Sequence, residues 1–224
     1  MSTKPSLTER RKAATQLDIA RAAADLFTDR GPDATTAEDI AERAGVALRT
    51  FYRYFRNKQD AVAPFLTGGA DRWRALLAAA APAGERGAEP LAAALERSVA
   101  EALAVPDETA ADGLRRTRGL LRAADGDPAL RAVWYRVNHE SEELLRPVVA
   151  ALAGPDADPV DVRLASAAAT AAIRVALETW AGTDAPAAEA GPLAVRCLRE
   201  LAGGISLLTP PPAPGPAPGP GSGR

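Results

Sequence analysis

Residues 45–62 read GVALRTFYRYFRNKQDAV, and this stretch decides the fold of the N-terminal part of the chain. Four of the chain's ten aromatic residues (four Phe, three Tyr and three Trp in all) lie within 51–55, interleaved with arginines. On a helix over about 47–56, side chains three, four and seven residues apart share one face. The period therefore predicts a core face formed by Leu48, Phe51 and Phe55. The opposite, cationic face is formed by Arg49, Tyr52, Arg53 and Arg56.

The residues before this helix predict a second short helix and a tight turn. Thr36-x-x-Asp39 has the spacing of a capping box, which favours a helix start near residue 36, and Gly45 ends that helix two turns later. A longer helix over 10–30, ended by Gly31, precedes it. Two short helices joined by a glycine turn are typical of a helix-turn-helix, whose second helix enters the major groove of DNA. A merely amphipathic helix with a solvated basic face is the alternative.

The stretch TTAEDIAERAGVALRTFYRYFRNKQDAV (35–62) resembles the DNA-binding domain of the TetR family of bacterial transcriptional regulators. ARAAADLFTDRG (20–31) resembles the first helix of the same domain. Ala47 departs from the pattern, which usually has Ser there, so the third helix lacks its usual N-cap. The positions that match the family pattern are Thr36, Ile40, Ala41, Ala44, Gly45, Val46, Thr50, Tyr52, Tyr54, Phe55 and Lys58.

The resemblance implies a role in DNA binding for seven residues. Thr36 and Tyr54 are expected to contact phosphates, and Lys58 the DNA backbone. Tyr52 is expected to pack on a thymine methyl group or to contact a phosphate. Residues 10–12 form either an arm near the minor groove or a solvated basic tail. Base edges are expected to be contacted by Arg49, Thr50 and Arg53.

The rest of the chain predicts a helical bundle, so the fold class is all-α. We expect a flexible arm at 1–9, the helix-turn-helix domain at 10–57, a ligand-binding and dimerisation domain at 58–208 and a disordered Pro/Gly tail at 209–224. Beyond the fourth helix, which begins at Lys58, Pro- and Gly-rich segments separate apolar-periodic stretches. They predict helices near 88–104, 109–124, 128–153, 160–181 and 192–208.

This second part is expected to bind a small molecule and to form a homodimer, as in the family. The helices at 160–181 and 192–208 are the expected interface, with Ala165, Ala169 and Ile173 allowing close approach; packing of that stripe inside the monomer is the alternative. Large side chains are sparse in this part, so the expected ligand-binding residues are Trp73, Trp134, Tyr135, His139 and Trp180.

Pro64 and the pair Gly68-Gly69 lie in the predicted fourth helix, which in the family connects the ligand pocket to the DNA-binding helices. Proline and glycine both disfavour a helix interior. Residues 64–69 therefore predict either a hinge that the ligand shifts or a fixed bend.

The composition excludes several classes of protein and several kinds of site. One cysteine excludes an internal disulfide framework and suits the cytoplasm, and one histidine excludes a multi-histidine metal site and a histidine-assisted triad. No apolar run approaches the ~20 residues of a membrane span. We expect no enzyme, no cofactor and no metal, but a ligand-responsive repressor that binds a palindromic operator in double-stranded DNA. The alternatives are an activator, or a helical ligand-binding or scaffolding protein that no longer binds DNA specifically.

Overall fold

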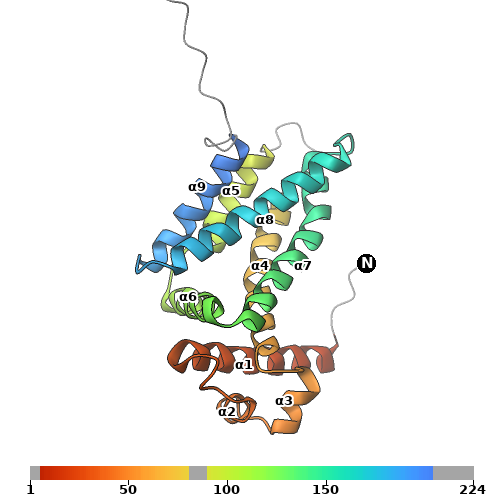
Figure 1. Ribbon diagram of the computed structural model, residues 1–224. Coiled ribbons are helices and arrows are strands. Elements are labelled where there is room, and N and C mark those ends of the chain that lie inside the picture. The colour runs from red at the N-terminus through yellow and green to blue at the C-terminus, as the bar shows by residue number, and fades with distance from the viewer. Residues whose placement is uncertain (1–5, 81–89, 204–224) are drawn as a thin grey trace, which may run out of the picture.

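The computed structural model describes residues 6–80 and 90–203, and within those ranges it is built from helices without a strand. Three helices form one end of the molecule, and a short 3₁₀ turn leads from them into a bundle (Figure 1). The elements are α1 (Leu7–Arg30), α2 (Ala37–Arg43), α3 (Leu48–Tyr54), η1 (Asp60–Val62), α4 (Ala63–Ala79), α5 (Leu91–Ala102), α6 (Glu108–Gly126), α7 (Pro128–Ala153), α8 (Pro159–Ala181), η2 (Ala187–Glu189) and α9 (Ala190–Ala202).

Helix α1 begins earlier than the sequence predicts. Ser6 forms a capping box with Glu9: the Ser6 amide donates to Glu9 Oε2 at 2.7 Å, and the Glu9 amide donates to Ser6 Oγ at 3.2 Å. These bonds satisfy two amides that otherwise have no partner within the helix. Residues 7–9, expected in a flexible arm, are therefore helical, and 1–5 lie outside the described residues. Arg10, Arg11 and Lys12 belong to α1 itself.

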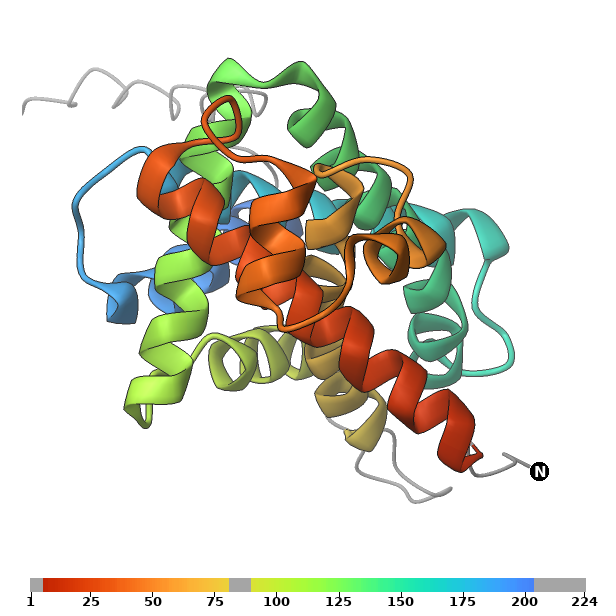
Figure 2. The same ribbon diagram turned by 90° about the horizontal axis from the view of Figure 1, so that it is seen from below.

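The helix-turn-helix has the predicted local structure. Thr36 is the N-cap of α2, with its hydroxyl accepting the Asp39 amide at 3.1 Å and the Asp39 carboxylate accepting the Thr36 amide at 2.9 Å. Gly45 has φ +66°, a left-handed value that L-residues with a side chain rarely adopt. Ala47 precedes α3 and, as predicted, makes no side-chain cap. Seen from below, α1 crosses the end of the molecule where both short helices lie (Figure 2).

The predicted fourth helix starts later, and its proline lies at a different place in it. Asn57 accepts the Asp60 amide at 2.8 Å, but the residues that follow form the 3₁₀ turn η1 and not an α-helix starting at Lys58. Pro64 falls in the first turn of α4, where a missing amide hydrogen breaks no helical bond. Residues 63–79 form one helix that includes Gly68 and Gly69. The helix is therefore unbroken across 64–69, and a hinge or bend there stays a prediction.

The helices of the bundle follow the predicted ranges closely. Asp107, Asp127 and Asp158 cap α6, α7 and α8 by accepting backbone amides of the first turn. Helix α9 ends at Ala202, so residues 204–208 of the expected last helix, and the Pro/Gly tail at 209–224, lie outside the described residues. Helices α5 and α9 lie side by side, and α8 crosses the bundle obliquely (Figure 1).

Buried side chains form two clusters. The first joins the DNA-binding end to the lower bundle and includes Phe27, Phe51 and Trp180. The second lies farther from that end and includes Trp73 and Leu145. Because the first cluster contains residues of α1–α3 together with residues of α6–α8, the two parts of the chain share a core.

Helix α6 touches α1 closely. A Cβ at Gly119 would lie 2.1 Å from Thr28 Oγ1, so only glycine fits there without a shift. Close by, the Arg116 guanidinium donates to the Asp25 carboxylate. Two further polar contacts cross the same boundary, from Gln59 to Asp127 at 2.8 Å and from Arg136 to Asp60 at 2.9 Å. The bundle is thus fixed to the DNA-binding end at several points.

Candidate DNA-binding surface and ligand cavity

Helix α3 presents the two predicted faces. Phe51 is fully buried and Phe55 nearly so, while Leu48 packs partly against the same cluster. Tyr52 is 54% exposed, and its ring meets Phe51 edge-on with centroids 5.3 Å apart. Arg49 and Arg53 of the opposite face are exposed; α3 ends at Tyr54, so the exposed Arg56 lies beyond the helix and not on its face. Thr50 is half-buried beside them.

Arg53 and Tyr54 continue this surface onto α1. The Arg53 guanidinium donates to the Tyr54 hydroxyl at 3.2 Å and lies 4.9 Å from the centre of its ring. Opposite them, an open hollow is bordered by Arg11 and Lys12 of α1, with Thr8 and Thr15. Four polar or cationic side chains of α1 therefore face the end of α3, which the sequence pattern of α3 alone did not indicate.

Thr36 and Lys58 also have structural partners. The Thr36 hydroxyl oxygen accepts the Asp39 amide at the N-cap of α2. Hydrogen bonds from the backbone and hydroxyl of Thr36, and the nearby Arg30 at 2.8 Å, hold the pKa of Asp39 below its usual value. Lys58 Nζ donates to the carbonyls of Pro32 at 2.8 Å and Thr35 at 3.0 Å. Two of its three hydrogens thus hold the α1–α2 loop.

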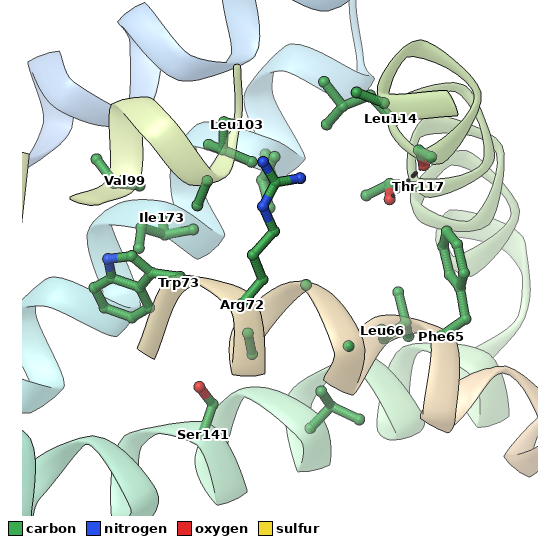
Figure 3. A pocket seen from close by; sticks show the side chains of 18 of the residues that line it. Phe65, Leu66, Arg72, Trp73, Val99, Leu103, Leu114, Thr117, Ser141 and Ile173 are labelled. Carbon is green, nitrogen blue, oxygen red and sulfur yellow. Dashed lines mark hydrogen bonds between the residues drawn. The ribbon is translucent and has the colours of Figure 1, made fainter. Parts of the chain in front are cut away.

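A cavity of about 500 Å³ lies between the two core clusters (Figure 3). Its walls come from α4, α5, α6, α7 and α8, and the middle of α1 contributes Leu17 and Arg21. Gly68 and Gly69 border it with open space where a side chain would be. These glycines therefore leave room for the cavity. The volume falls in the range of small-molecule sites, ~300–1,000 Å³.

Only two of the five expected ligand-binding residues border this cavity. Trp73 and Trp134 do; their indole N–H groups donate to Ser98 Oγ at 3.1 Å and Glu178 Oε1 at 2.7 Å. Tyr135 is 49% exposed on the outside of α7, and His139 is also exposed, because the helical period turns both away from the interior.

Trp180, the fifth expected residue, is a core residue. It is 1% exposed, and its indole N–H donates to the Pro186 carbonyl at 3.0 Å. The Arg118 guanidinium lies 3.9 Å from the centre of its ring. Burial, with the positive charge of Arg122 nearby, lowers the pKa of Arg118. These contacts hold the α8–α9 connection and leave no surface of Trp180 for a ligand.

The polar groups of the cavity differ between its opening and its interior. Arg21, Gly69, Arg72 and Asp107 are exposed, which places them at the opening. Inside, Thr170 is 7% exposed, and its hydroxyl has no hydrogen-bond partner in the structure. Other polar residues of the wall that are at least half-buried are Thr117, Asn138 and Ser141. The sequence alone did not single out any of these residues.

Helix α8 buries inside the monomer the face that was expected at a dimer interface. Ala169 is 2% exposed within the second cluster, and Ile173 borders the cavity, so this stripe packs inside the monomer. The exposed apolar side chains of α8 are Val160 and Leu164, each 62% exposed, and Val175 at 44%. Positions 160, 164 and 175 lie within about 60° of each other around a helix. They form an outward apolar stripe.

Comparison with known proteins agrees with this architecture. A family model described as bacterial regulatory proteins of the tetR family matches residues 19–62, and one described as the MftR C-terminal domain matches 89–206, just over half of the chain. The HTH-type transcriptional regulator TcmR of Streptomyces glaucescens is 30% identical over 154 residues, covering 69% of this chain and 67% of that protein. The HTH-type transcriptional repressor Rv3405c of Mycobacterium tuberculosis is 39% identical over 88 residues, 37% of this chain and 46% of its own length.

Solved structures share the fold. A chain from Syntrophomonas wolfei, described as a TetR-family transcriptional regulator, superposes with a TM-score of 0.60 at 16% identity, covering 88% of this chain and 100% of its own. In the described part of the protein, every helix is too short or too polar to cross a membrane. The exposed cationic face of α3, the helix-turn-helix geometry and both family matches lead to one conclusion: the chain belongs to the TetR family of bacterial transcriptional regulators.

Proposed function

We propose that this DNA-binding regulator is a ligand-responsive repressor that binds a palindromic operator as a homodimer. The observation that carries the proposal is the joint presence of an exposed cationic α3 and a cavity of about 500 Å³ in one shared core. The related Rv3405c is named a repressor, which favours the same direction of regulation here.

At the operator, α3 lies in the major groove. Arg49 and Arg53 donate to base edges, where a bidentate contact of arginine with guanine is the commonest specific contact, and Thr50 lies between them. Tyr52 packs on a thymine methyl group or a phosphate. Thr36, Tyr54 and Lys58 contact the sugar-phosphate backbone, with Lys58 using its one hydrogen not taken by the loop carbonyls. Arg11 and Lys12 extend this backbone contact from α1.

The dimer forms through the outward apolar stripe of α8. One recognition helix covers few base pairs, whereas two related by a two-fold axis reach half-sites ~34–36 Å apart. The large side chains Val160, Leu164 and Val175 are exposed in the monomer and gain most from being covered. This replaces the stripe through Ala169, whose side chain is already buried. Helix α9 remains the expected second element of the interface.

An effector in the cavity lowers operator affinity by favouring an arrangement of the bundle that spaces the two α3 helices wrongly. Helix α6 is well placed to transmit this change. Its residues Leu114 and Thr117 border the cavity. Farther along the same helix, Gly119 lies against Thr28 of α1. Any movement of α6 therefore displaces α1, because no space separates the two helices there.

Two alternatives predict other outcomes. An activator would raise transcription from the bound promoter, and a scaffolding protein would bind small molecules without a preferred DNA sequence. A regulator of bacterial genes works beside the chromosome, so we place the protein in the cytoplasm, acting by binding and not by catalysis.

Selection from random double-stranded DNA tests the proposal. We expect enrichment of an inverted repeat, and repression of a reporter carrying that repeat upstream. Higher reporter expression would support the activator instead. No enriched sequence, with all DNA bound equally, would contradict operator binding and favour the scaffolding alternative.

The dimer surface is tested with Leu164→Glu, which places a charge in the apolar stripe. Sedimentation should show the wild type as a dimer and this variant as a folded monomer with reduced operator affinity. Ala92→Glu, an exposed alanine on α5, is the matched control and should remain dimeric. A Leu164→Glu protein that remains dimeric would place the interface elsewhere.

A further inference from the structure

We propose that the cavity selects an amphipathic organic anion, with its apolar body inside and its negative group held by Arg72 at the opening. The inference rests on the proposed effector role of the cavity and adds the chemical class of the effector. It is drawn from the distribution of charge and of unused hydrogen-bonding groups around the cavity.

The interior is apolar and partly aromatic. Trp73 and Trp134 contribute indole rings whose N–H groups already have protein partners, so a ligand meets their carbon surfaces. Aliphatic side chains form most of the remaining interior, including Leu66, Val137 and Leu177. Such walls contribute affinity for an apolar body but none for a charge placed deep among them.

The opening is cationic. Charged residues that border the cavity are Arg21, Arg72 and Asp107, two positive and one negative, which leaves a net charge of +1. Neither arginine forms an ion pair with any residue in the described ranges. Asp107 already accepts the Ala110 amide at 2.9 Å as the N-cap of α6. The unused charge at the opening is therefore positive.

Arg72 is the better placed of the two cations. Its side chain rises from α4 across the cavity toward Leu103 (Figure 3). Its single hydrogen bond, to the Glu101 carbonyl, has the long donor–acceptor distance of 3.5 Å and is weak. A guanidinium carries five N–H donors in a planar fork that matches a carboxylate or another oxyanion. Most of these donors are free to hold the negative group of a ligand.

Thr170 adds a buried polar group to the wall of the cavity. Its hydroxyl is buried without a partner, although buried hydroxyls are normally hydrogen-bonded. Thr170 borders the cavity, but its hydroxyl oxygen is covered, so a ligand reaches it only after the side chain rotates. The favoured effector therefore combines an anionic group with an apolar body.

Two fluorescent probes with the same ring system separate charge from apolar contact. 1-Anilinonaphthalene-8-sulfonate is an apolar anion, and N-phenyl-1-naphthylamine is its neutral counterpart without the sulfonate. We expect each probe to bind one site per chain, with the sulfonate at least tenfold tighter. Equal affinities for the two probes would overturn the proposed charge selection while leaving the cavity as a ligand site.

Three single substitutions on α4 test which residues determine the binding of the two probes. Arg72→Gln should weaken sulfonate binding about tenfold and leave the neutral probe unchanged. Arg74→Gln is the matched control: Arg74 pairs with Asp71 at 2.7 Å, does not border the cavity, and should leave both affinities unchanged. Gly69→Leu places a side chain in open space at the opening and should weaken both probes. Wild-type affinity of both probes for Gly69→Leu would show that they bind elsewhere and would overturn the proposal.

The result for charge selection stays separable from the proposed regulation. Probe binding is measured without DNA, so it tests the cavity alone. Addition of the sulfonate to the protein–operator complex then tests regulation. Charge-selective binding that leaves operator affinity unchanged would support the ligand class and contradict the effector role. Failure of Arg72→Gln to distinguish the probes would overturn the ligand class, whatever happens at the operator.

Discussion

The DNA-binding end and the region around the ligand cavity differ in how densely their side chains are packed. In the first, α1–α3 pack around a fully buried Phe51, and Arg49, Tyr52 and Arg53 are exposed. In the second, five helices leave about 500 Å³ unfilled, and the polar groups that bear on binding lie at the opening or are buried inside. The tight core fixes the position of α3, whereas the cavity can change its shape around a ligand. Helix α6 contacts both regions and can couple them.

Substitutions at the two cores should differ in cost. Phe51→Ala removes a fully buried ring from a dense core and should lower the free energy of unfolding by about 3–5 kcal/mol. Leu177→Ala removes a side chain that already faces the cavity and should cost only about 2 kcal/mol. Urea unfolding at one fixed protein concentration measures both. Equal losses would mean that the cavity is closed in solution.

The unpaired hydroxyl of Thr170 should cost stability when no ligand is bound. Thr170→Val keeps the shape of the side chain and removes the hydroxyl, so we expect a gain of about 1 kcal/mol in the ligand-free protein. Thermal unfolding of the ligand-free proteins measures this gain in stability. Ser166→Ala is a useful contrast, because Ser166 is buried but donates to the Val162 carbonyl at 2.8 Å. A loss of stability on Thr170→Val would indicate that the hydroxyl has a partner.

A better N-cap at the start of α3 should raise the stability of the protein. Ala47 has an extended backbone suited to an N-cap but no side-chain oxygen, so Ala47→Ser should raise the free energy of unfolding by up to about 1 kcal/mol. Ala34→Ser, at an exposed position of the α1–α2 loop, is the control and should change little. Unchanged stability of Ala47→Ser would mean that water already satisfies these amides.

Acid should weaken the junction between the two regions. Burial alone would raise the pKa of Asp127, but hydrogen bonds from Gln59 and from two backbone amides outweigh it and lower the pKa. A lowered folded pKa contributes stability above the ordinary value of about 3.9, and that stability is lost as the pH falls through the folded value. Asp127→Asn should therefore show a smaller acid-side loss than the wild type, whereas Asp156→Asn should not. Identical pH profiles would remove Asp127 from this account.

The sequence predicted the DNA-binding end almost residue by residue because its signals are local. The Thr36 capping box, the turn at Gly45 and the period of Leu48, Phe51 and Phe55 each involve residues close in the chain. One feature that it missed there depends on distant contacts, because the carbonyls that hold Lys58 come from 23 and 26 residues away.

For the bundle, the sequence predicted helices but not which faces they bury. Tyr135 and His139 are large residues on α7 and were expected at a ligand, yet they face outward. The alanine stripe of α8 was expected at the dimer interface, yet Ala169 is buried within the monomer. An alanine-rich helix shows little contrast between its faces, so only the packing of its neighbours decides which one is buried. The cavity residue Arg72 was missed for the same reason.

Operator binding by Arg53→Ala tests the central claim most directly. Fluorescence anisotropy with the DNA immediately upstream of this protein's own gene, across a salt series, compares this variant with the wild type and with Arg199→Ala. Arg199 is exposed and pairs with Glu96 at the far end of the bundle. We predict tight wild-type binding that weakens steeply with salt, an unchanged control, and a sequence-specific loss of about 1–3 kcal/mol for Arg53→Ala. Equal binding of operator and scrambled DNA, indifferent to Arg53, would contradict the assignment of α3 as the helix that recognises the operator.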